Sequence, residues 1–555
     1  MIMLISLYLL LISMMNFFLS IYFYIMKKSF LINFLLMKFM SFNIELITYI
    51  DWMSMMFTSV VMMISSMVLI YSMSYMLNHY YIKRFMNLII IFFLSMMLMI
   101  FSPNMISILI GWDGLGLSSF CLIIFYQNKK SYNSGINTIL MNRIGDINIL
   151  IMISLLFNHN TWNFLYILNM PPMIFIMIIM ASITKSAQIP FSTWLPMAMA
   201  APTPVSSLVH SSTLVTAGIY LMIRLNYLFN NLFLFTLMFL SFWTLILASS
   251  SALFEFDLKK IIALSTLSQL SLMFLSLSMK LSMLSFFHMI THAMFKSLLF
   301  LCSGIIIHNY FNNQDIRLIN NLSLNMPLIS IIFNMASLTL CGMPFLSGFY
   351  SKDLIIEYFN IFNMNFFTFN MMYISMMLTI MYSFRLIYYI SLKSSNYNFF
   401  NKSITNNKMI NSIYLLFLLS MTYGTIINWI LFNSLNLIIL NLNFKLLIYK
   451  LSIISFLILF FLKIKIMIMK LLTLNIYFYN NMWFLPKMFY KCKYTQNIMN
   501  NYMIYLIDYS WLEKLSSKKF LFMIIKMNKY KKFNKLNFSV IMTFFMYLLM
   551  ILLLY

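Results

Sequence analysis

Three lysines lie inside or beside long apolar segments: Lys185 in IIMASITKSAQIPF, Lys296 in FFHMITHAMFKSLLF and Lys352 in MPFLSGFYSKDLII. A charged side chain at the centre of a membrane helix costs at least ~2.5–3.5 kcal/mol, so it marks a functional site, usually an ion or proton path. Histidines and acids occur near these lysines in the sequence. The pattern predicts a membrane protein that handles protons.

His288, His292 and Lys296 follow one another at intervals of four residues. On an α-helix this spacing keeps the three side chains close to one face. Imidazole has an unperturbed pKa of about 6.5 and changes its charge readily near neutral pH. A lone histidine is more often a hydrogen-bonded packing residue, but the triple favours a proton relay.

Asp113, in ILIGWDGLGLSSF, is an acid inside an apolar segment. It is either an acid used for helix packing or the partner of a buried lysine, which we expect to be Lys185. A nearby carboxylate favours the charged form of a buried lysine, whereas burial favours the neutral form. Opening and closing such a pair would therefore switch proton affinity.

Arg143 and Asp146, in MNRIGDINI, are three residues apart and can pair on a helix. The pair closes one end of a channel or compensates its own charges structurally, and the sequence leaves both open.

Helix-breaking residues flank two of the lysines. Pro190 follows Lys185, and Pro344 precedes Lys352, to which Asp353 is directly attached. Helices broken at mid-membrane are a recurrent ion-site device in transporters, often within internal repeats. The two units hint at such a repeat, and His210 follows the PTP turn one helix after Lys185.

The composition predicts the elements that carry these residues. The 555 residues are 63% hydrophobic and 8% charged, with mean hydropathy +0.90. Continuous apolar runs of ~20 residues indicate transmembrane helices rather than a β-barrel. We therefore predict an all-α polytopic membrane protein with about 15–16 spans. The spans are expected near 4–26, 31–50, 53–77, 85–102, 104–126, 135–157, 171–195, 203–225, 233–254, 260–278, 282–308, 325–350, 364–390, 411–437, 446–469 and 537–555.

The basic residues of the loops predict an orientation. Most of them, from Lys27 and Lys28 to Lys393, follow odd-numbered spans, which defines the positive-inside face. The amino terminus is then expected on the opposite face. Lys280, Lys445 and Lys450 depart from the pattern.

Five regions are expected along the chain: N-terminal helices (1–84), a proton-translocating core of two inverted repeats (85–390), additional helices (391–470), a lateral interfacial amphipathic helix (471–536) and a final anchor helix (537–555). Residues 391–555 hold 19 lysines against Asp508 and Glu513. Lysines among apolar segments suit anionic phospholipid headgroups, such as those of cardiolipin, rather than nucleic acid. A disordered basic linker is the alternative for 471–536.

The sequence predicts no redox cofactor in this chain. Cys121, Cys302, Cys341 and Cys492 have neither metal-ligand spacing nor an evident pairing, and a Gly-rich nucleotide loop does not occur. The excess of Phe, Ile, Met, Asn, Lys and Tyr indicates an A+T-rich genome, such as that of many invertebrate mitochondria.

Seven blocks resemble the chain 5 family of antiporter-like subunits of mitochondrial NADH–ubiquinone oxidoreductase (complex I), which is related to Mrp-type antiporters. They are GWDGLG, NRIGD, KSAQIPFSTWLP, PTPVSSLVHSSTLVTAGIYLMIR, DLKKIIALSTLSQL, HMITHAMFKSLLFLCSG and GMPFLSGFYSKD, and they cover about 105–355 densely; DYSWLEKL near 508–515 is similar to the family's lateral helix.

The resemblance implies proton translocation across the mitochondrial inner membrane, driven by electron transfer from NADH to ubiquinone. NAD, FMN, iron–sulfur clusters and ubiquinone would lie in other subunits, and the lateral helix would contact neighbouring antiporter-like subunits. Asp113 stands where the family often has Glu, which would pair with the lysine at Lys185. The Asp side chain is one methylene shorter, so its ion-pair distance and switching threshold would differ from those of the family. His210, His292 and Lys296 would continue the polar axis from Lys185 to Lys352.

Two alternatives remain at this point. A freestanding Mrp-like cation/proton antiporter would share the axis of lysines and acids, although the basic C-terminal extension disfavours it. A structural clamp without pumping is disfavoured because buried ionisable groups reduce stability.

Overall fold

The computed structural model describes residues 2–39, 42–159, 161–164, 171–319, 322–362, 365–393, 407–432, 440–464, 473–488 and 526. Residues 1–480 form one compact unit and residues 481–555 a second. The predicted anchor helix at 537–555 and most of the predicted lateral helix at 471–536 lie outside the described residues. In that stretch the structure describes α20 (Thr473–Asn480) and a short 3₁₀ turn (Met482–Phe484).

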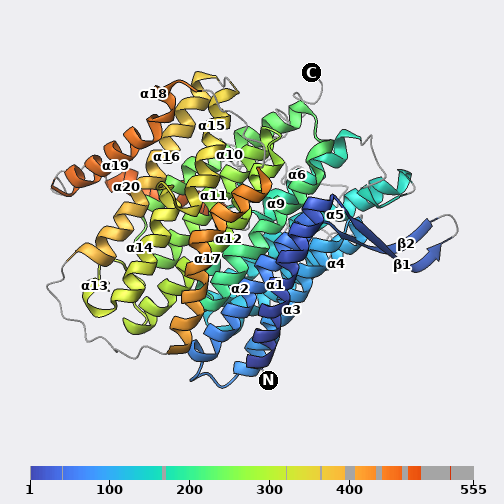
Figure 1. The fold of residues 1–555 in the computed structure, drawn as a ribbon, viewed down its shortest axis with the longest axis horizontal. Helices are drawn as coiled ribbons and strands as arrows, with labels where there is room; N and C mark the ends of the chain where they lie inside the picture. Colours follow the sequence, from blue (N-terminus) through green and yellow to red (C-terminus); the bar gives the residue numbers. More distant parts are fainter. Residues whose placement is uncertain are drawn as a thin grey trace. The chain divides into compact units, whose positions relative to one another are not determined.

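The first unit is a bundle of apolar helices (Figure 1). Eleven helical segments in the described part are long and apolar enough to cross a membrane. They comprise α1 (Ile2–Met26), α2 (Trp52–Tyr75), α3 (Ile82–Phe101), α4 with its 3₁₀ extension (Met105–Tyr126), α5 (Lys129–Leu156), α8 to α9 (Thr203–Leu228), α10 (Asn231–Phe254), α11 (Leu258–Ser278), α12 (Ser282–Asn309), α16 with its π-helical end (Phe366–Leu392) and α17 (Asn407–Leu431).

Shorter helices complete the unit. Two of them, α6 (Pro172–Lys185) and α14 (Pro327–Cys341), end inside the bundle and carry the predicted breaks. The remaining ones are α7 (Trp194–Met197), α13 (Leu322–Asn325), α15 (Leu354–Ile361), α18 (Leu442–Lys445) and α19 (Leu447–Ile464).

The span predicted at 31–50 is wrong. This segment is an antiparallel hairpin of β1 (Phe30–Phe39) and β2 (Phe42–Ile50), in which Lys38 faces Asn43. A helix would hold Lys38 and Glu45 in mid-membrane, whereas in the hairpin Lys38 lies near the tip and Glu45 faces Leu35 about midway along the strands. Hairpin pairing satisfies the backbone hydrogen bonds of both strands without a membrane-spanning helix that carries these two charges.

This hairpin also corrects the predicted orientation. It returns the chain to the face it left, so the count of crossings falls by one between α1 and α2. The amino terminus then shares a face with Lys83, Lys129 and Arg317 instead of opposing them. We call that face the basic face, and Lys27, Lys28 and Lys280 lie on the other one.

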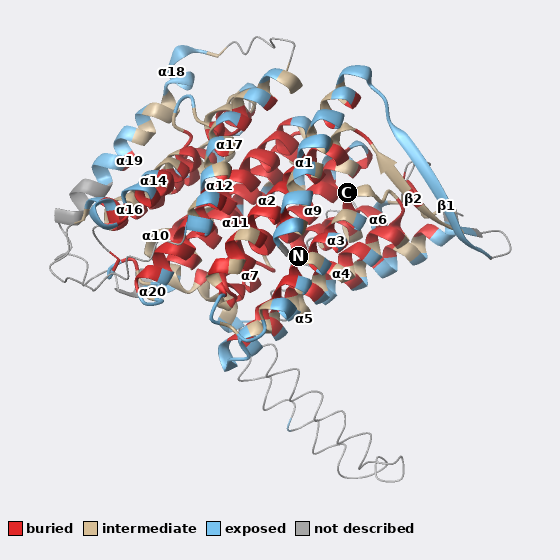
Figure 2. Ribbon diagram, turned by 60° about the horizontal axis from the view of Figure 1, so that its bottom comes forward, coloured by how far each residue is buried: buried red, intermediate tan, exposed pale blue. Residues whose placement is uncertain are grey.

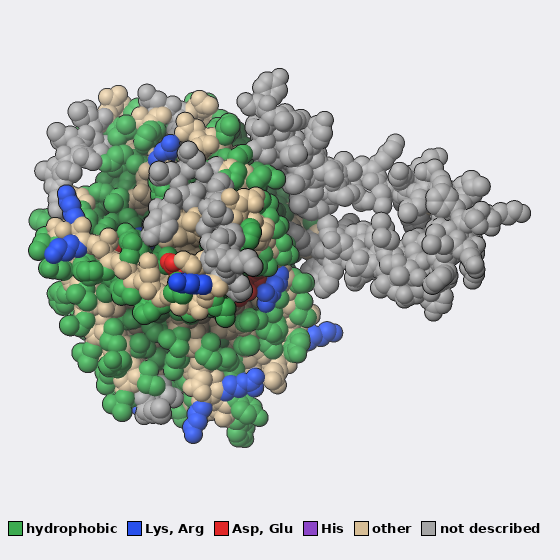
Figure 3. All heavy atoms as spheres, turned by 90° about the vertical axis from the view of Figure 1, so that its right-hand side faces the viewer, with side chains coloured by type: hydrophobic (Ala, Val, Ile, Leu, Met, Phe, Trp, Pro, Cys, Tyr) green, Lys and Arg blue, Asp and Glu red, His purple; other side chains and the backbone are tan. Residues whose placement is uncertain are grey.

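Burial is concentrated in α2, α9, α11 and α12, whereas α1, β1 and α19 are largely exposed (Figure 2). Every residue of α12 from Leu284 to Ile307 is buried. This helix packs against α2, α11, α14 and α17, so it forms the axis of the bundle. Hydrophobic side chains cover much of the described surface in Figure 3, as expected for lipid-facing helices.

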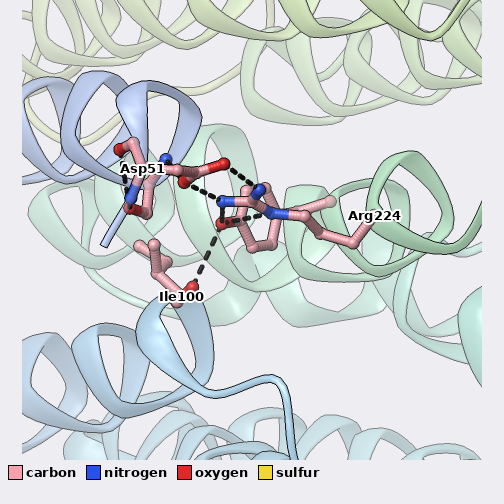
Figure 4. Close-up of polar contacts among 5 residues, drawn as sticks. Asp51, Ile100 and Arg224 are labelled. Carbon is pink, nitrogen blue, oxygen red and sulfur yellow. Dashed lines mark hydrogen bonds and ion pairs between the residues drawn. The ribbon is translucent and has the colours of Figure 1, made fainter. Parts of the chain in front are cut away.

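A polar cluster fastens three helix ends on the face opposite the basic one (Figure 4). Asp51, the N-cap of α2, accepts hydrogen bonds from both terminal nitrogens of Arg224 on α9, one of them over 2.7 Å. Arg224 also donates to the Tyr220 hydroxyl, which in turn donates to the Ile100 carbonyl of α3 over 3.1 Å. The guanidinium thus joins α2, α3 and α9.

Candidate functional site

One end of the site is a group of two acids and an arginine. Nη1 of Arg143 on α5 lies 3.3 Å from Oδ2 of Asp146 and 3.9 Å from Oδ2 of Asp113 on α4. The Asp146 side chain is 9% exposed and the Asp113 side chain 34%. The predicted pairing of Arg143 with Asp146 is therefore present, and Asp113 shares the same guanidinium.

Lys185 is the last residue of α6 and is completely buried. Its Nζ donates to the Trp112 carbonyl over 3.1 Å and lies 5.0 Å from the centroid of the Trp112 ring. None of the ion pairs among the described residues includes Lys185. The structure thus places this lysine beside the residue preceding Asp113 rather than in contact with the Asp113 carboxylate.

Hydrogen bonds hold the break that follows Lys185. The indole nitrogen of Trp194 donates to the Thr184 carbonyl over 3.0 Å. Gln188, inside the break, accepts from the Thr244 hydroxyl of α10 over 2.5 Å. The Thr184 carbonyl near the end of α6 is thereby satisfied by a side chain, which is one way for a helix to end inside a bundle.

His210 lies in a π-helical segment, η5 (Ser206–Thr213), and is completely buried. Both of its ring nitrogens lack a hydrogen-bond partner within the described part of the chain. Its ring centroid lies 6.1 Å from that of Trp194, in the break after Lys185. Single π-turns inside α-helices occur frequently at functional sites.

The predicted relay lies on α12, with all three side chains buried. Lys296 donates through Nζ to the Ser265 hydroxyl of α11. His288 contacts Gln269 Oε1 through Nε2 over 3.1 Å, whereas neither ring nitrogen of His292 has a partner among the described residues. Ser265 and Gln269, one turn apart on α11, thus bind the two ends of the relay.

Lys352 and Asp353 lie in a second π-helical segment, η7 (Phe349–Asp353). Nζ of Lys352 donates to the Leu340 carbonyl over 3.3 Å and to the Thr379 hydroxyl of α16 over 3.2 Å. The Leu340 carbonyl is available because α14 ends one residue later. An ammonium group is favoured at such a helix C-terminus, where unpaired carbonyls carry partial negative charge.

Two glycines permit the break before Lys352. Gly342 ends α14 with φ of 86°, a left-handed conformation that suits glycine. At Gly348 an added Cβ would lie 1.8 Å from the Thr339 carbonyl oxygen, so only glycine fits there. The Oδ1 atom of Asp353 is buried without a hydrogen-bond partner in the described chain.

Several polar neighbours were missed by reasoning from the sequence. Ser265 and Gln269 bind the relay, Ser351 binds His288, and Thr379 binds Lys352. Ser265 and Gln269 are four residues apart, the same interval as the relay, and this was the available signal. Thr379 has no such signal, because only the packing of α16 against α14 brings it to Lys352.

The fold and these residues define an antiporter-type membrane subunit. A family model described as NADH:quinone oxidoreductase/Mrp antiporter matches residues 102–381. Models for the complex I chain 5 N-terminus and the NADH dehydrogenase subunit 5 C-terminus match 36–86 and 382–555. The fold is similar to an Mrp complex structure from Dietzia, with TM-score 0.72 and 22% identity over 88% of this chain and 56% of that one.

Relatives refine this class. The chain is 46% identical over 498 residues to NADH-ubiquinone oxidoreductase chain 5 of Anopheles quadrimaculatus, covering 86% of this chain and 85% of the relative. Identity to the Locusta migratoria protein is 45% over 520 residues, which cover 91% and 90% of the two chains. The chain therefore belongs to the NADH–ubiquinone oxidoreductase chain 5 family.

This membership makes the chain a multi-pass, proton-translocating subunit of complex I in the mitochondrial inner membrane. The family match over 382–555 covers the C-terminal extension that disfavoured a freestanding antiporter. Within the described residues, no cluster of three or more His, Cys, Asp or Glu side chains could hold a metal ion.

Proposed function

We propose that protons move along a buried axis of ionisable side chains in this subunit. The axis begins at Asp113 and Lys185 and continues through His210 and the relay of α12. It ends at Lys352 beside the α14 break. The observation that supports it most directly is the contact of His288 with Ser351, because Ser351 adjoins Lys352 in the chain.

In this mechanism Arg143 controls the first lysine. While Arg143 engages Asp113 and Asp146, Lys185 is left with the Trp112 carbonyl, and burial favours its neutral form. When a carboxylate moves from Arg143 to Lys185, the ammonium form becomes favoured. Alternation between the two arrangements binds and releases one proton, as expected of a two-state element.

Water completes the middle of the axis. The ring nitrogens of His210 and His292 are buried without partners among the described residues. Buried polar groups of this kind are usually satisfied by ordered water. Hydrated histidines can accept a proton on one ring nitrogen and donate from the other, which is the property a relay needs.

At the far end, Lys352 receives the proton in a pocket of acceptors. The Leu340 carbonyl and Thr379 hydroxyl stabilise its ammonium form, and Asp353 supplies a buried carboxylate nearby in the chain. We assign Asp353 and the Arg143–Asp146 pair supporting roles. The proton path itself then consists of Asp113, Lys185, His210, His288, His292, Lys296 and Lys352.

The regional division and the partners follow the same proposal. Residues 85–390 form the translocating core with two repeats, and the other four regions frame it. The lateral helix at 471–536 would contact neighbouring antiporter-like subunits, and its lysines would contact anionic lipids such as cardiolipin. NAD, FMN, iron–sulfur clusters and ubiquinone would be bound by other subunits of the complex.

Replacing Lys185 or Lys352 by Met tests this function. We expect complex I carrying either change to lose NADH-driven proton uptake in sealed vesicles. Lys260→Met is the matched control, because Lys260 is 41% exposed and paired with Asp257 at the basic face. Normal pumping in both Lys→Met variants would leave the chain with a bracing role and overturn the proposal.

A further inference from the structure

A cavity lies away from the proton axis, where the helices α10, α11, α15 and α16 begin or end. Its volume is about 420 Å³. Leu234, Phe235 and Met238 of α10 form its apolar wall. Lys280, after the end of α11, and Asn365, before the start of α16, lie on its polar side.

Lys280 carries a charge that is unusual in this place. It is exposed, in the short turn between α11 and α12, on the face opposite the basic one. Membrane proteins gather their loop lysines on the positive-inside face, so Lys280 departs from the general pattern. No ion pair among the described residues neutralises it.

An exposed aromatic stripe leads from this cavity along α10. Phe235, Phe239 and Trp243 follow one another at intervals of four residues, so they share one face of the helix. Their exposed fractions are 61%, 44% and 38%. Phe235 itself lines the cavity, so the apolar track begins beside the lysine and runs toward the membrane interior.

We propose that this cavity binds an anionic phospholipid of the leaflet opposite the basic face. The phosphate meets Lys280 and the neighbouring polar groups, and one acyl chain follows the stripe from Phe235 to Trp243. The charge argues for this occupant, because an unpaired lysine at the interface attracts anionic headgroups. The stripe argues for it as well, because a soluble anion would leave the exposed rings of Phe235 and Phe239 uncovered.

The bound lipid would connect the cavity to the end of the proton axis. Phe362, directly after α15, and Asn365, directly before α16, also line the cavity. The α15 helix follows Lys352 directly, and α16 carries Thr379, which binds the Lys352 ammonium. A lipid in this position would brace both helices against the ends of α10 and α11.

Lipid retention tests the proposal. Complex I with Lys280→Gln is purified in mild detergent, washed with phosphatidylcholine, and its remaining phospholipids are quantified by mass spectrometry. We expect a single anionic phospholipid fewer per complex than in the unaltered enzyme. Lys28→Gln is the matched control, since Lys28 is an exposed lysine of the same face outside the cavity, and it should retain the full number.

Two further variants separate charge from shape. Lys280→Arg keeps the cation and should retain the lipid, whereas Thr368→Phe fills the cavity from α16 and should lose it with Lys280 intact. Equal retention in Lys280→Gln and Lys28→Gln would overturn the proposal. A density map of the unaltered complex in phosphatidylglycerol nanodiscs should show a headgroup at Lys280; a polypeptide or an empty cavity there would also overturn it.

Discussion

The Nδ1 atom of His288 lies 2.9 Å from the hydroxyl oxygen of Ser351, the residue immediately before Lys352. The Thr291 hydroxyl, one turn further along α12, donates to the same oxygen over 3.2 Å. These two hydrogen bonds attach the π-helical segment η7 to the relay helix α12 at Ser351, the residue that precedes Lys352. The Ser351 hydroxyl therefore links the imidazole of His288 to the backbone next to Lys352.

Ser351→Ala should weaken the transfer from the relay to Lys352. The change removes the hydrogen bonds of Ser351 with His288 and Thr291. The contact with His288 alone is worth about 1 kcal/mol, which corresponds to a roughly fivefold slower step. The measurement is proton uptake per NADH oxidised in sealed vesicles. Ser347→Ala is the matched control, since the buried Ser347 hydroxyl has no partner among the described residues. Equal losses in the two variants would contradict a connecting role for Ser351.

Arg143→Gln should separate pumping from stability. The Arg143 side chain is 46% exposed, and ion pairs this exposed contribute about 0–1 kcal/mol, so the complex should still assemble. Proton uptake should fall roughly tenfold, because Asp113 and Asp146 would then remain available to hold Lys185 charged. Native gels and vesicle uptake measure the two effects. A parallel loss of assembly would instead assign Arg143 to structural charge compensation.

The helical core could be predicted from the sequence because each of its signals lies within a short stretch of the chain. Apolar runs of membrane length, the histidines of α12 and the proline and glycine breaks are each contained in a few neighbouring residues. The hairpin at 30–50 escaped this reasoning, since its two strands together have the length of a membrane helix. The interruption by Lys38 and Glu45 was the available signal.

The contacts of the site could be predicted less completely. The lysines and histidines stand out because their side chains are rare in apolar segments, but their acceptors are serine, threonine and backbone carbonyl groups. Ser265 and Thr379 are ordinary residues in a membrane helix, and the Trp112 carbonyl carries no sequence signal at all. Which acid pairs with Arg143 also depends on how α4 packs against α5.

Asp51→Asn should destabilise the subunit, because it leaves the Arg224 guanidinium buried without its carboxylate. Breaking a buried ion pair by removing one partner costs about 3–5 kcal/mol. Thermal denaturation of the subunit within detergent-solubilised complex I measures the change. Asp315→Asn is the control: Asp315 pairs with Arg317, whose side chain is 55% exposed, so the expected cost is about 1 kcal/mol or less.

The stabilisation from Asp51 should not change between pH 8 and pH 6. Burial acts to raise the pKa of Asp51, but the hydrogen bonds and charge of Arg224, with Ser54, hold that pKa below its ordinary value. A carboxyl group whose pKa is lower in the folded protein stabilises it fully above the unfolded pKa of ~3.9. This contribution is lost as the pH falls through the folded pKa. The difference in denaturation temperature between Asp51→Asn and the unaltered subunit should therefore be constant from pH 8 to pH 6, and a difference that shrinks within that range would show that another group titrates with the pair.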